Sequence, residues 1–419
     1  MKQKQGGISR RDFGKLSLAA GVSVLSARGA LAETNSETLK IGLIGCGGRG
    51  TANAINMLNE RNENVQLIAL ADTFEDRLNS CRNRLENHDS EAVAGRTHVD
   101  DGHCFVGLDA YQQLLETDVD IVLDCSPPYA RPYHVDAIVD AGKHIFAEKP
   151  ISVDPVGARQ VIAAADRAEE QGLTFVVGTQ KRHQREYIET IEQIQDGALG
   201  DIVMMRAYFC VGIPHARERQ DGWSDLEYRI RNWIPNNWTS GANIVEQHVH
   251  NIDVINWVMG DEPPQVAFAS GGRAWLTEDE RYGDIWDSFT VDYEYPNGVH
   301  MFSFSRWWPQ GTASSVFDQV TGTEGQSNCI DLASGSGIDP SIQEHLDLVN
   351  SVRGDGPYLN QGRRMAYSTL TALMGRMAAY TGERITWDDV MNSDLSIVPE
   401  TLDFDADYPL PPVPVPGQA

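Results

Sequence analysis

The stretch "LKIGLIGCGGRG", residues 39–50, decides the fold of this chain. Residues 39–45 form an apolar run rich in β-branched side chains, which predicts a buried strand. Gly45, Gly47 and Gly50 follow with the spacing G-x-G-x-x-G. In a dinucleotide-binding turn, the first glycine makes the tight bend, the second lets a pyrophosphate approach the backbone, and the third lets a helix pack closely on the strand.

A second predicted strand, "VQLIALAD" at residues 65–72, ends on an acid, Asp72. A carboxylate at this point accepts hydrogen bonds from ribose hydroxyls and repels a 2′-phosphate, so it favours NAD over NADP. Arg49 argues in the other direction, because an arginine near the ribose attracts that phosphate. We give Asp72 more weight and predict NAD, with NADP as the alternative. A glycine-rich turn without any ligand is the structural alternative to the whole unit.

Strands and helices continue to alternate along the next hundred residues. Residues 119–128, "VDIVLDCSPP", predict a strand, residues 134–141 a helix, and residues 143–147 another strand that runs into "EKP". This alternation predicts a doubly wound parallel sheet, in which ligands lie beyond the carboxyl ends of the strands. The predicted cofactor contacts are Gly45, Gly47, Gly48, Arg49, Gly50, Asp72, Ser126, Pro127, Glu148 and Gln180.

Alternating apolar and polar residues in the second half of the chain predict a mostly antiparallel sheet. Such runs occur at residues 201–211, 265–276, 288–308 and 315–330, and "PNG" at 296–298 predicts a hairpin turn. We therefore expect an α/β domain followed by an α+β domain. The predicted segments are a signal peptide at 1–32, a Rossmann domain at 39–170, a substrate and oligomerisation domain at 171–395, and a Pro-rich extended tail at 396–419.

Several motifs together resemble one family. "GCGGRG", the run "SPP…H…AGKH…EKP", "GTQKRH" and "EQHVHNIDVINWVMG" resemble the Gfo/Idh/MocA oxidoreductases, the superfamily of glucose–fructose oxidoreductase and inositol dehydrogenase. The resemblance covers nearly all of residues 39–395. It implies a nicotinamide-binding Rossmann domain, a second domain built on a large antiparallel sheet, sugar or polyol substrates, and a homo-oligomer formed through that sheet.

The resemblance also assigns catalytic residues. Lys149 matches the family's cleft lysine, whose ammonium stabilises the alkoxide that forms as hydride leaves carbon and can relay a proton. The structural alternative for Lys149 is a salt bridge to Glu148 or another carboxylate. His250 matches the catalytic histidine, a general base. Glu246 stands where the family has an aspartate, and His248 stands where a glycine is common.

Residues 244–258 predict one helix, on which Glu246, His250 and Asp253 share a face. A histidine hydrogen-bonded inside the protein is the structural alternative for His250. A metal site made by His248 and His250 is disfavoured, because residues i and i+2 point to different faces of a helix. We therefore predict no metal.

The substrate contacts are predicted from position. The strand at residues 173–177 runs into "GTQKRH", whose polar residues should face the cleft. Tryptophans near a cleft stack on sugar rings but also serve as ordinary core, and both readings stay open for Trp233 and Trp238. The predicted substrate residues are Arg182, His183, Trp233, Trp238 and Asp253.

The N-terminus and the charge bear on location and partners. "SRRDFGKLSLAAGVSVLSARGALA", residues 9–32, resembles a twin-arginine signal with a small-residue cleavage site at Ala30-Leu31-Ala32, which predicts export of the folded protein to the periplasm. Its apolar part is too short for a membrane anchor. The chain has 60 acidic and 34 basic residues and a formal charge of −26, which argues against nucleic acid as a partner.

The predicted function is an NAD-dependent oxidoreductase that acts on a secondary hydroxyl of a sugar or polyol. Because free nicotinamide cofactor is scarce in the periplasm, we expect the cofactor to be retained and recycled. An alternative is a redox-neutral NAD-dependent glycoside hydrolase, which would oxidise, eliminate, add water and reduce again. A second alternative is a sugar-binding protein without catalysis.

Overall fold

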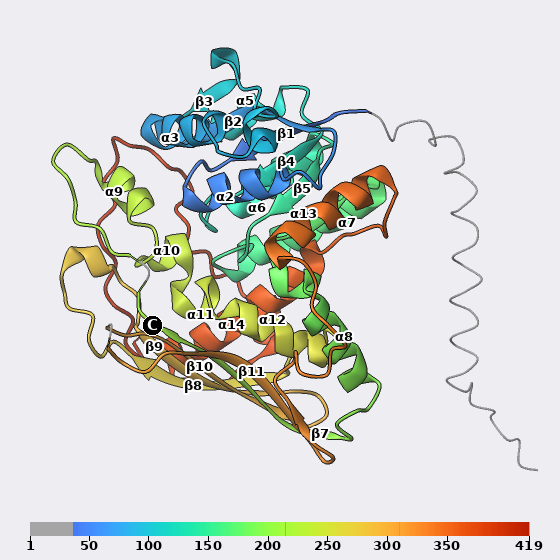
Figure 1. Cartoon of the computed structure of the whole chain (residues 1–419). Helices are drawn as coiled ribbons and strands as arrows, with labels where there is room; N and C mark the ends of the chain where they lie inside the picture. Colours follow the sequence, from blue (N-terminus) through green and yellow to red (C-terminus); the bar gives the residue numbers. More distant parts are fainter. Residues whose placement is uncertain (1–36, 214, 310, 419) are drawn as a thin grey trace, which may run out of the picture. The chain divides into compact units, whose positions relative to one another are not determined.

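The first sheet confirms the predicted doubly wound architecture. The structure is a computed structural model that describes residues 37–213, 215–309 and 311–418, so the predicted signal peptide lies outside the described residues. Six parallel strands are arranged in the order β3-β2-β1-β4-β5-β6, with the order reversing between β1 and β4 (Figure 1). The strands are β1 (Leu39–Ile44), β2 (Val65–Asp72), β3 (Cys104–Val106), β4 (Ile121–Asp124), β5 (His144–Ala147) and β6 (Phe175–Val177).

Helices between these strands bury their apolar sides against the sheet. The longest of them, α7 (Pro155–Gln171), is capped at its N-terminus by Asp154, whose carboxylate accepts a hydrogen bond from the backbone N–H of Gly157 at 2.8 Å. It ends where Gly172 adopts a left-handed conformation. The helices are α2 (Gly48–Met57), α3 (Glu75–Glu86), α4 (Glu91–Ala94), α5 (Ala110–Leu115), α6 (Arg131–Asp140) and α7 (Pro155–Gln171), with the 3₁₀ helix η1 (Asp101–His103).

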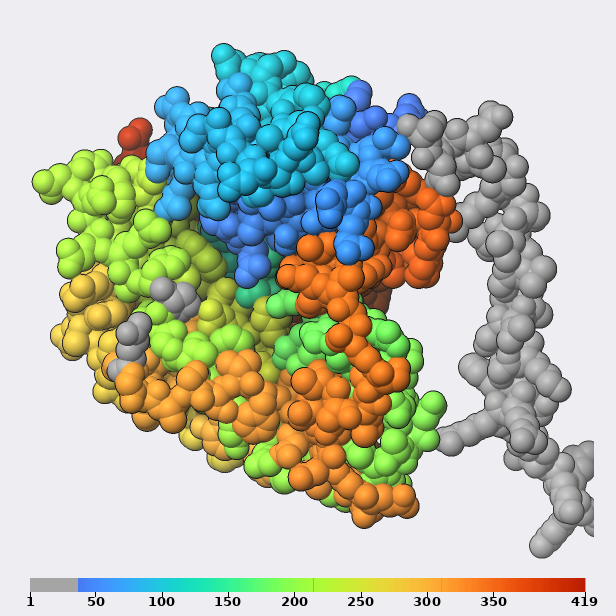
Figure 2. All heavy atoms as spheres, in the orientation of Figure 1, coloured from blue at the N-terminus to red at the C-terminus, as the bar shows by residue number. Residues whose placement is uncertain are grey.

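The first domain extends further along the chain than predicted. We expected the second domain to begin near Gln171, but β6 pairs in parallel with β5 and completes the first sheet. The chain also returns to this domain late in the sequence. Leu348 and Val349 on α13 (Pro340–Arg353) join the core around Ile41 and Met57, and Figure 2 shows the orange residues of this region against the blue ones. The two sheets follow one another in the sequence, but α13 packs on the core of the first domain, so no single boundary divides the two domains.

The second sheet has seven strands in the order β12-β11-β7-β10-β9-β8-β13, and all its pairings are antiparallel except that of β7 with β10. The predicted hairpin joins β9 to β10, where Gly298 has a positive φ of 75°. The strands are β7 (Ile202–Val211), β8 (Val266–Gly272), β9 (Ser288–Glu294), β10 (His300–Trp307), β11 (Ser315–Gly322), β12 (Gln326–Ser327) and β13 (Ile385–Thr386).

One face of the second sheet is covered by helices and the other is open. Helices α12 (Val249–Val258) and α14 (Gly362–Thr381) pack on the covered face, where Met301 and Tyr293 are fully buried. On the open face Phe268 and Phe302 are 55% and 38% exposed. The remaining helices are η2 (Gln180–His183), α8 (Arg185–Gln195), α9 (Asp225–Arg231), α10 (Asn237–Ser240), α11 (Ala242–Glu246), η3 (Glu280–Tyr282) and α15 (Trp387–Met391).

The C-terminal segment, residues 396–418, contains no helix or strand, which agrees with the predicted extended tail. The segment packs on the rest of the protein: its residues Ile397, Leu402, Phe404 and Tyr408 contact the buried cluster that includes Tyr129, Leu226 and Trp238. Within the described part of the chain, no helix is both long enough and apolar enough to cross a membrane.

Candidate functional site

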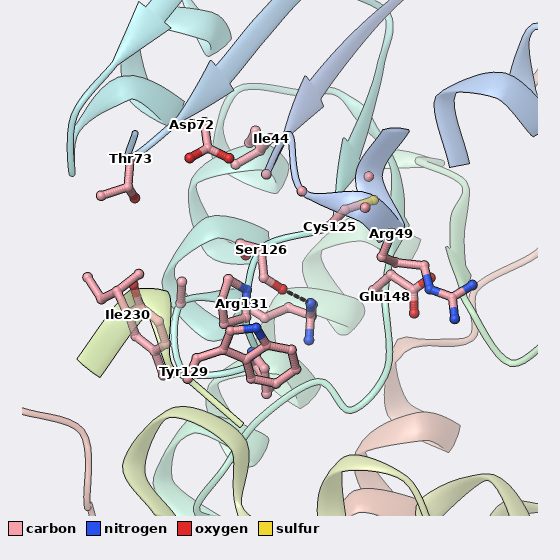
Figure 3. A pocket seen from close by; sticks show the side chains of 18 of the residues that line it. Ile44, Arg49, Asp72, Thr73, Cys125, Ser126, Tyr129, Arg131, Glu148 and Ile230 are labelled. Carbon is pink, nitrogen blue, oxygen red and sulfur yellow. Dashed lines mark hydrogen bonds and ion pairs between the residues drawn. The ribbon is translucent and has the colours of Figure 1, made fainter. Parts of the chain in front are cut away.

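A cavity of about 790 Å³ lies beyond the carboxyl ends of β1, β2, β4 and β5, where helices of the second sheet cover it. Figure 3 shows Asp72, Ser126 and Glu148 around this cavity, with Ile230 of α9 on the far wall. Its volume is in the usual range for ligand and cofactor pockets, and its position is the one expected for a doubly wound sheet.

The glycine turn leaves room for a pyrophosphate and none for side chains inside the turn. A Cβ on Gly50 would lie 1.8 Å from the carbonyl oxygen of Gly45, so only glycine allows α2 to pack so close to β1. A Cβ on Gly47 or Gly48 would meet no atom within 4 Å, which leaves the start of α2 open to the cavity. The first N–H groups of α2 have no side-chain cap, and they fit a pyrophosphate.

Asp72 lies at the end of β2, as predicted. Its carboxylate accepts hydrogen bonds from the backbone N–H groups of Cys46 at 2.7 Å and Phe74 at 2.8 Å. Each carboxylate oxygen keeps a further acceptor position, which fits a ribose hydroxyl. Burial raises the pKa of Asp72, although these two N–H groups oppose the shift.

Arg49 does not lie beside Asp72. Its Nε is 3.5 Å from Oε1 of Glu148, which also accepts a hydrogen bond from Asn53 at 2.9 Å. Arg49 therefore turns toward the β5 end of the cavity, away from the predicted ribose position. This placement removes the main sequence argument for NADP.

The turn after β4 is held by a buried arginine that the sequence analysis did not single out. Arg131 donates to the carbonyl oxygens of Ser126 and Pro150 (Figure 3 marks the first bond). Asp124, at the end of β4, accepts from the Ser126 hydroxyl at 2.6 Å. These contacts fix Ser126 and Pro127 on the floor of the cavity, where they were predicted.

Lys149 reaches the second domain. Its Nζ donates to the backbone carbonyl of Glu246 at 2.6 Å and to the Glu246 carboxylate Oε1 at 3.2 Å. An ammonium has three N–H groups, so one remains for the cavity that Lys149 lines. The other oxygen, Oε2 of Glu246, is buried without a hydrogen-bond partner among the described residues. The salt bridge considered as the structural alternative for Lys149, to Glu148 or another carboxylate, is therefore present, and its partner is Glu246.

His250 lines the same cavity, and no described side chain hydrogen-bonds its ring. Burial lowers the pKa of His250 well below its usual value, and the nearby cations Lys149 and Lys181 lower it further. The imidazole is therefore neutral at pH 7 and able to accept a proton. The alternative of an interior, hydrogen-bonded histidine does not fit this placement.

The predicted single helix at residues 244–258 is wrong. Helix α11 ends at Glu246 and α12 begins at Val249, with a turn at Gln247 and His248. Two side-chain contacts to β10 occupy this turn: Trp307 donates to Gln247 at 2.8 Å, and the His248 ring lies 2.7 Å from the Ser303 hydroxyl. Glu246 and His250 still line the same cavity, although they lie on separate helices.

The contact of His248 with Ser303 bears on the metal site that the sequence disfavoured. His248 is fully buried against Ser303, outside the cavity lining, and burial lowers its pKa to about 3. The described residues contain no group of three or more His, Cys, Asp or Glu side chains placed to hold a metal ion.

Three residues predicted to contact substrate lie outside the cavity lining. Arg182 binds Asp253 at 2.9 Å and Asp261 at 2.5 Å, and His183 lies 2.6 Å from a carboxylate oxygen of Asp347. Asp253 is buried between Arg182 and Arg364 and does not line the cavity. These side chains form ion pairs with one another and with neighbouring elements, so their role in the structure is to hold those elements together.

Of the two tryptophans, only Trp233 lines the cavity, as predicted for a substrate contact. Trp238 is 6% exposed, lies outside the lining, and packs edge-on against Tyr129 with ring centroids 5.1 Å apart. Gln180 also lines the cavity, in agreement with its prediction.

Further basic residues line the cavity. Lys181, from the run predicted to face the cleft, is bound by Asp318 at 2.7 Å, and Arg77, Arg217 and His215, to which the sequence assigned no role, also line the cavity. Burial lowers the pKa of His215 to about 4, and Arg217 and Arg77 add to the shift. The segment that carries His215 and Arg217 has no periodicity, so no sequence pattern indicated it.

Comparison with known proteins agrees with this geometry. Residues 39–179 match the family described as "Oxidoreductase family, NAD-binding Rossmann fold", and residues 187–327 match the family described as "GFO/IDH/MocA C-terminal domain". Among solved structures, scyllo-inositol dehydrogenase from Lactobacillus casei with bound NAD(H) and scyllo-inositol superposes with a TM-score of 0.64 at 18% identity, covering 83% of this chain and 99% of that one. At this identity the likeness concerns the fold.

Curated relatives are also similar in sequence. Myo-inositol 2-dehydrogenase of Thermotoga maritima is 25% identical over 261 residues, which are 62% of this chain and 66% of that protein. Inositol 2-dehydrogenase of Cereibacter sphaeroides is 28% identical over 239 residues, 56% of this chain and 59% of that protein. The chain thus matches about three fifths to two thirds of the length of these two relatives.

Proposed function

Because the chain belongs to the Gfo/Idh/MocA family of oxidoreductases, we propose that it oxidises a secondary hydroxyl of a sugar or polyol with NAD as the acceptor. The observation that carries this proposal is the convergence of Lys149, Glu246 and the neutral His250 on the cavity that the glycine turn and Asp72 also line. When bound there, NAD would supply the acceptor for the hydride that leaves the carbinol carbon.

Lys149 stabilises negative charge on the substrate oxygen. Two of its N–H groups are held by Glu246, so the ammonium cannot swing away and its remaining N–H is aimed at the cavity. As the hydroxyl becomes an alkoxide, this prepositioned charge stabilises the developing anion without reorganisation.

His250 takes the hydroxyl proton onto an unprotonated ring nitrogen. Burial, Lys149 and Lys181 hold its pKa below the usual value, so the ring is unprotonated across the neutral range. Its ring lacks a hydrogen-bonding side chain among the described residues, which leaves it available to a substrate hydroxyl.

Glu246 supports a substrate with several hydroxyls. Its Oε2 is buried and unpartnered within the described structure, and leaving such an oxygen unpaired is costly. A second hydroxyl next to the reacting one would satisfy it, and Trp233 offers an aromatic face for a sugar or cyclitol ring.

The test is formation of NADH from a panel of aldoses and cyclitols. Wild-type protein should give NADH with at least one of them, and Lys149→Ala should lower the rate by about 10²–10⁴. Lys143→Ala is the matched control, because Lys143 lies outside the cavity lining and its Nζ donates to the carbonyl oxygen of Thr117 at 3.5 Å. Equal rates in both variants would contradict the proposal.

Location and assembly are part of the same proposal. The twin-arginine motif supports a periplasmic protein that is exported with its cofactor bound and retains it.

The open face of the second sheet supports a homo-oligomer, since Tyr208 on this face contacts Phe304 and Phe317 with ring centroids 4.7 Å and 4.4 Å apart. A clustered aromatic face of this kind is typical of a subunit interface. Analytical ultracentrifugation of wild-type protein and Phe302→Glu tests the assembly.

A further inference from the structure

We propose that Arg231 and Phe404 are positioning residues for the cofactor: they clamp the turn between β2 and α3, which carries Asp72, and so close the adenosine end of the cleft. This inference rests on the proposed function, because it takes the occupant of the cleft to be a dinucleotide. It concerns residues from α9 and from the C-terminal segment, neither of which belongs to the parallel sheet.

Arg231 joins α9 to the first domain by two kinds of contact. Its guanidinium binds both carboxylate oxygens of Asp76 on α3, at 2.8 Å and 3.1 Å. Its Cζ lies 3.8 Å from the ring centroid of Phe74, and Glu227 holds its Nε at 2.7 Å. A two-bond ion pair and a cation–π contact made by one side chain fix both the distance and the orientation of the turn.

The clamped turn is the one that orients Asp72. The backbone N–H of Phe74 donates to Oδ1 of Asp72 at 2.8 Å, so movement of Phe74 would release this carboxylate oxygen. Asp72, Phe74 and Arg231 all line the cavity, together with Ile230 from α9. Figure 3 shows Ile230 across the cavity from Asp72 and Thr73. The clamp therefore forms the wall beside the predicted ribose position.

The C-terminal segment ties the clamp from outside. It is anchored to the first domain where the Ile397 N–H donates to Asp154 at 2.9 Å, and to α9 where the Tyr408 N–H donates to Asp225 at 3.1 Å. Between these anchors Phe404 meets Phe74 with ring centroids 6.4 Å apart. In Figure 1 the red trace of this segment passes between the first domain and α9 before it ends beside the second sheet.

The arrangement has a consequence for cofactor exchange. A dinucleotide in the cavity would lie beside Phe74 and Arg231, while Phe404 packs against Phe74 from outside the cavity lining, so we expect its departure to be faster when these contacts are lost. Binding energy at a site remote from the reacting carbon then slows release without changing the chemical step. This is a physical means of retaining a cofactor in a compartment that does not supply it.

The experiment measures release of 1,N⁶-etheno-NAD from the full chain by stopped-flow fluorescence. Arg231→Gln and Phe404→Ala should each speed release by about tenfold and weaken the affinity for NAD by a similar factor, with the single-turnover rate of NADH formation from bound NAD within about twofold of wild type. Arg82→Gln is the matched control, since Arg82 also binds two carboxylates, Glu86 and Asp101, but on α3 away from the cavity.

The outcomes are distinct. Release rates that match wild type in both clamp variants overturn the clamp, even if the enzyme oxidises polyols as proposed. A slower single-turnover rate of NADH formation with unchanged release also overturns it, because the residues would then act on the chemical step. If wild-type protein binds no NAD, the proposed function fails and the clamp fails with it. Phe404→Ala removes only a half-buried ring, so it serves if Arg231→Gln does not fold.

Discussion

Replacement of Asp253 by asparagine should destabilise the protein strongly while leaving substrate recognition intact. The sequence suggested a substrate contact, but the structure buries this carboxylate between two arginines. Arg182 binds it at 2.9 Å, Arg364 at 2.8 Å, and the Ser368 hydroxyl donates to it at 2.8 Å. Burial alone would raise the pKa of Asp253, yet the two guanidinium groups outweigh burial and hold the pKa below its usual range.

The expected magnitude follows from this burial. Removing one partner of a buried ion pair leaves an uncompensated charge and costs about 3–5 kcal/mol. At roughly 2.1 cal/mol/K of unfolding entropy per residue over about 380 residues, this loss lowers the thermal midpoint by about 4–6 °C. Differential scanning calorimetry of Asp253→Asn measures the shift, and the KM for the polyol is measured below the transition.

The control is an ion pair of the same chemistry on the surface. Asp166 binds Arg363 with both carboxylate oxygens, but each side chain is 48% exposed. Asp166→Asn should therefore cost only about 0–1 kcal/mol. A midpoint for Asp253→Asn within 1 °C of wild type, together with a KM raised tenfold or more, would refute the structural assignment and restore Asp253 as a substrate contact.

Three further predictions concern the cofactor, the base and the leader. NAD should bind more tightly than NADP, and Asp72→Ala should narrow the difference in a binding titration; a wild-type preference for NADP would contradict the role of Asp72. Because the pKa of His250 is lowered by burial and two lysines, kcat/KM should stay level as the pH falls to 6.5 and decline only below it. Lys181→Gln removes one of those cations and should move that decline upward; a wild-type decline centred at or above pH 6.5 would refute this. Changing Arg10 and Arg11 to lysine should keep the precursor in the cytoplasm of a host with a twin-arginine system, as fractionation and immunoblotting would show; unchanged export would show that the leader is of another type.

Local patterns predicted where the proposed cofactor residues lie. The glycine turn, Asp72 and the residues after β4 and β5 depend on strand ends, and all parallel strands end at the same edge of a sheet. The structure places each of these side chains around one cavity. Short-range sequence was sufficient because each residue is positioned by the strand that it directly follows.

The substrate half was harder to predict, because tertiary contacts decide it. Spacing placed Glu246, His250 and Asp253 on one helix face, but contacts of Gln247 and His248 to β10 break that helix. Arg182 turns away to a carboxylate 71 residues later in the sequence, a pairing that no local pattern encodes. The packing of Phe404 against Phe74, which lines the cavity, was equally hidden, since an extended segment has no periodicity.

We propose that the chain transfers hydride from a polyol carbon to NAD, with Lys149 and His250 handling the proton. Mass spectrometry of the NADH formed from a polyol deuterated at the oxidised carbon tests this transfer. We expect one deuterium per NADH, with Lys149→Ala and His250→Ala each slowing its transfer by about 10²–10⁴ while NAD affinity stays nearly unchanged. NADH without deuterium, or incorporation of solvent deuterium beside that carbon with NAD neither consumed nor produced, would contradict it.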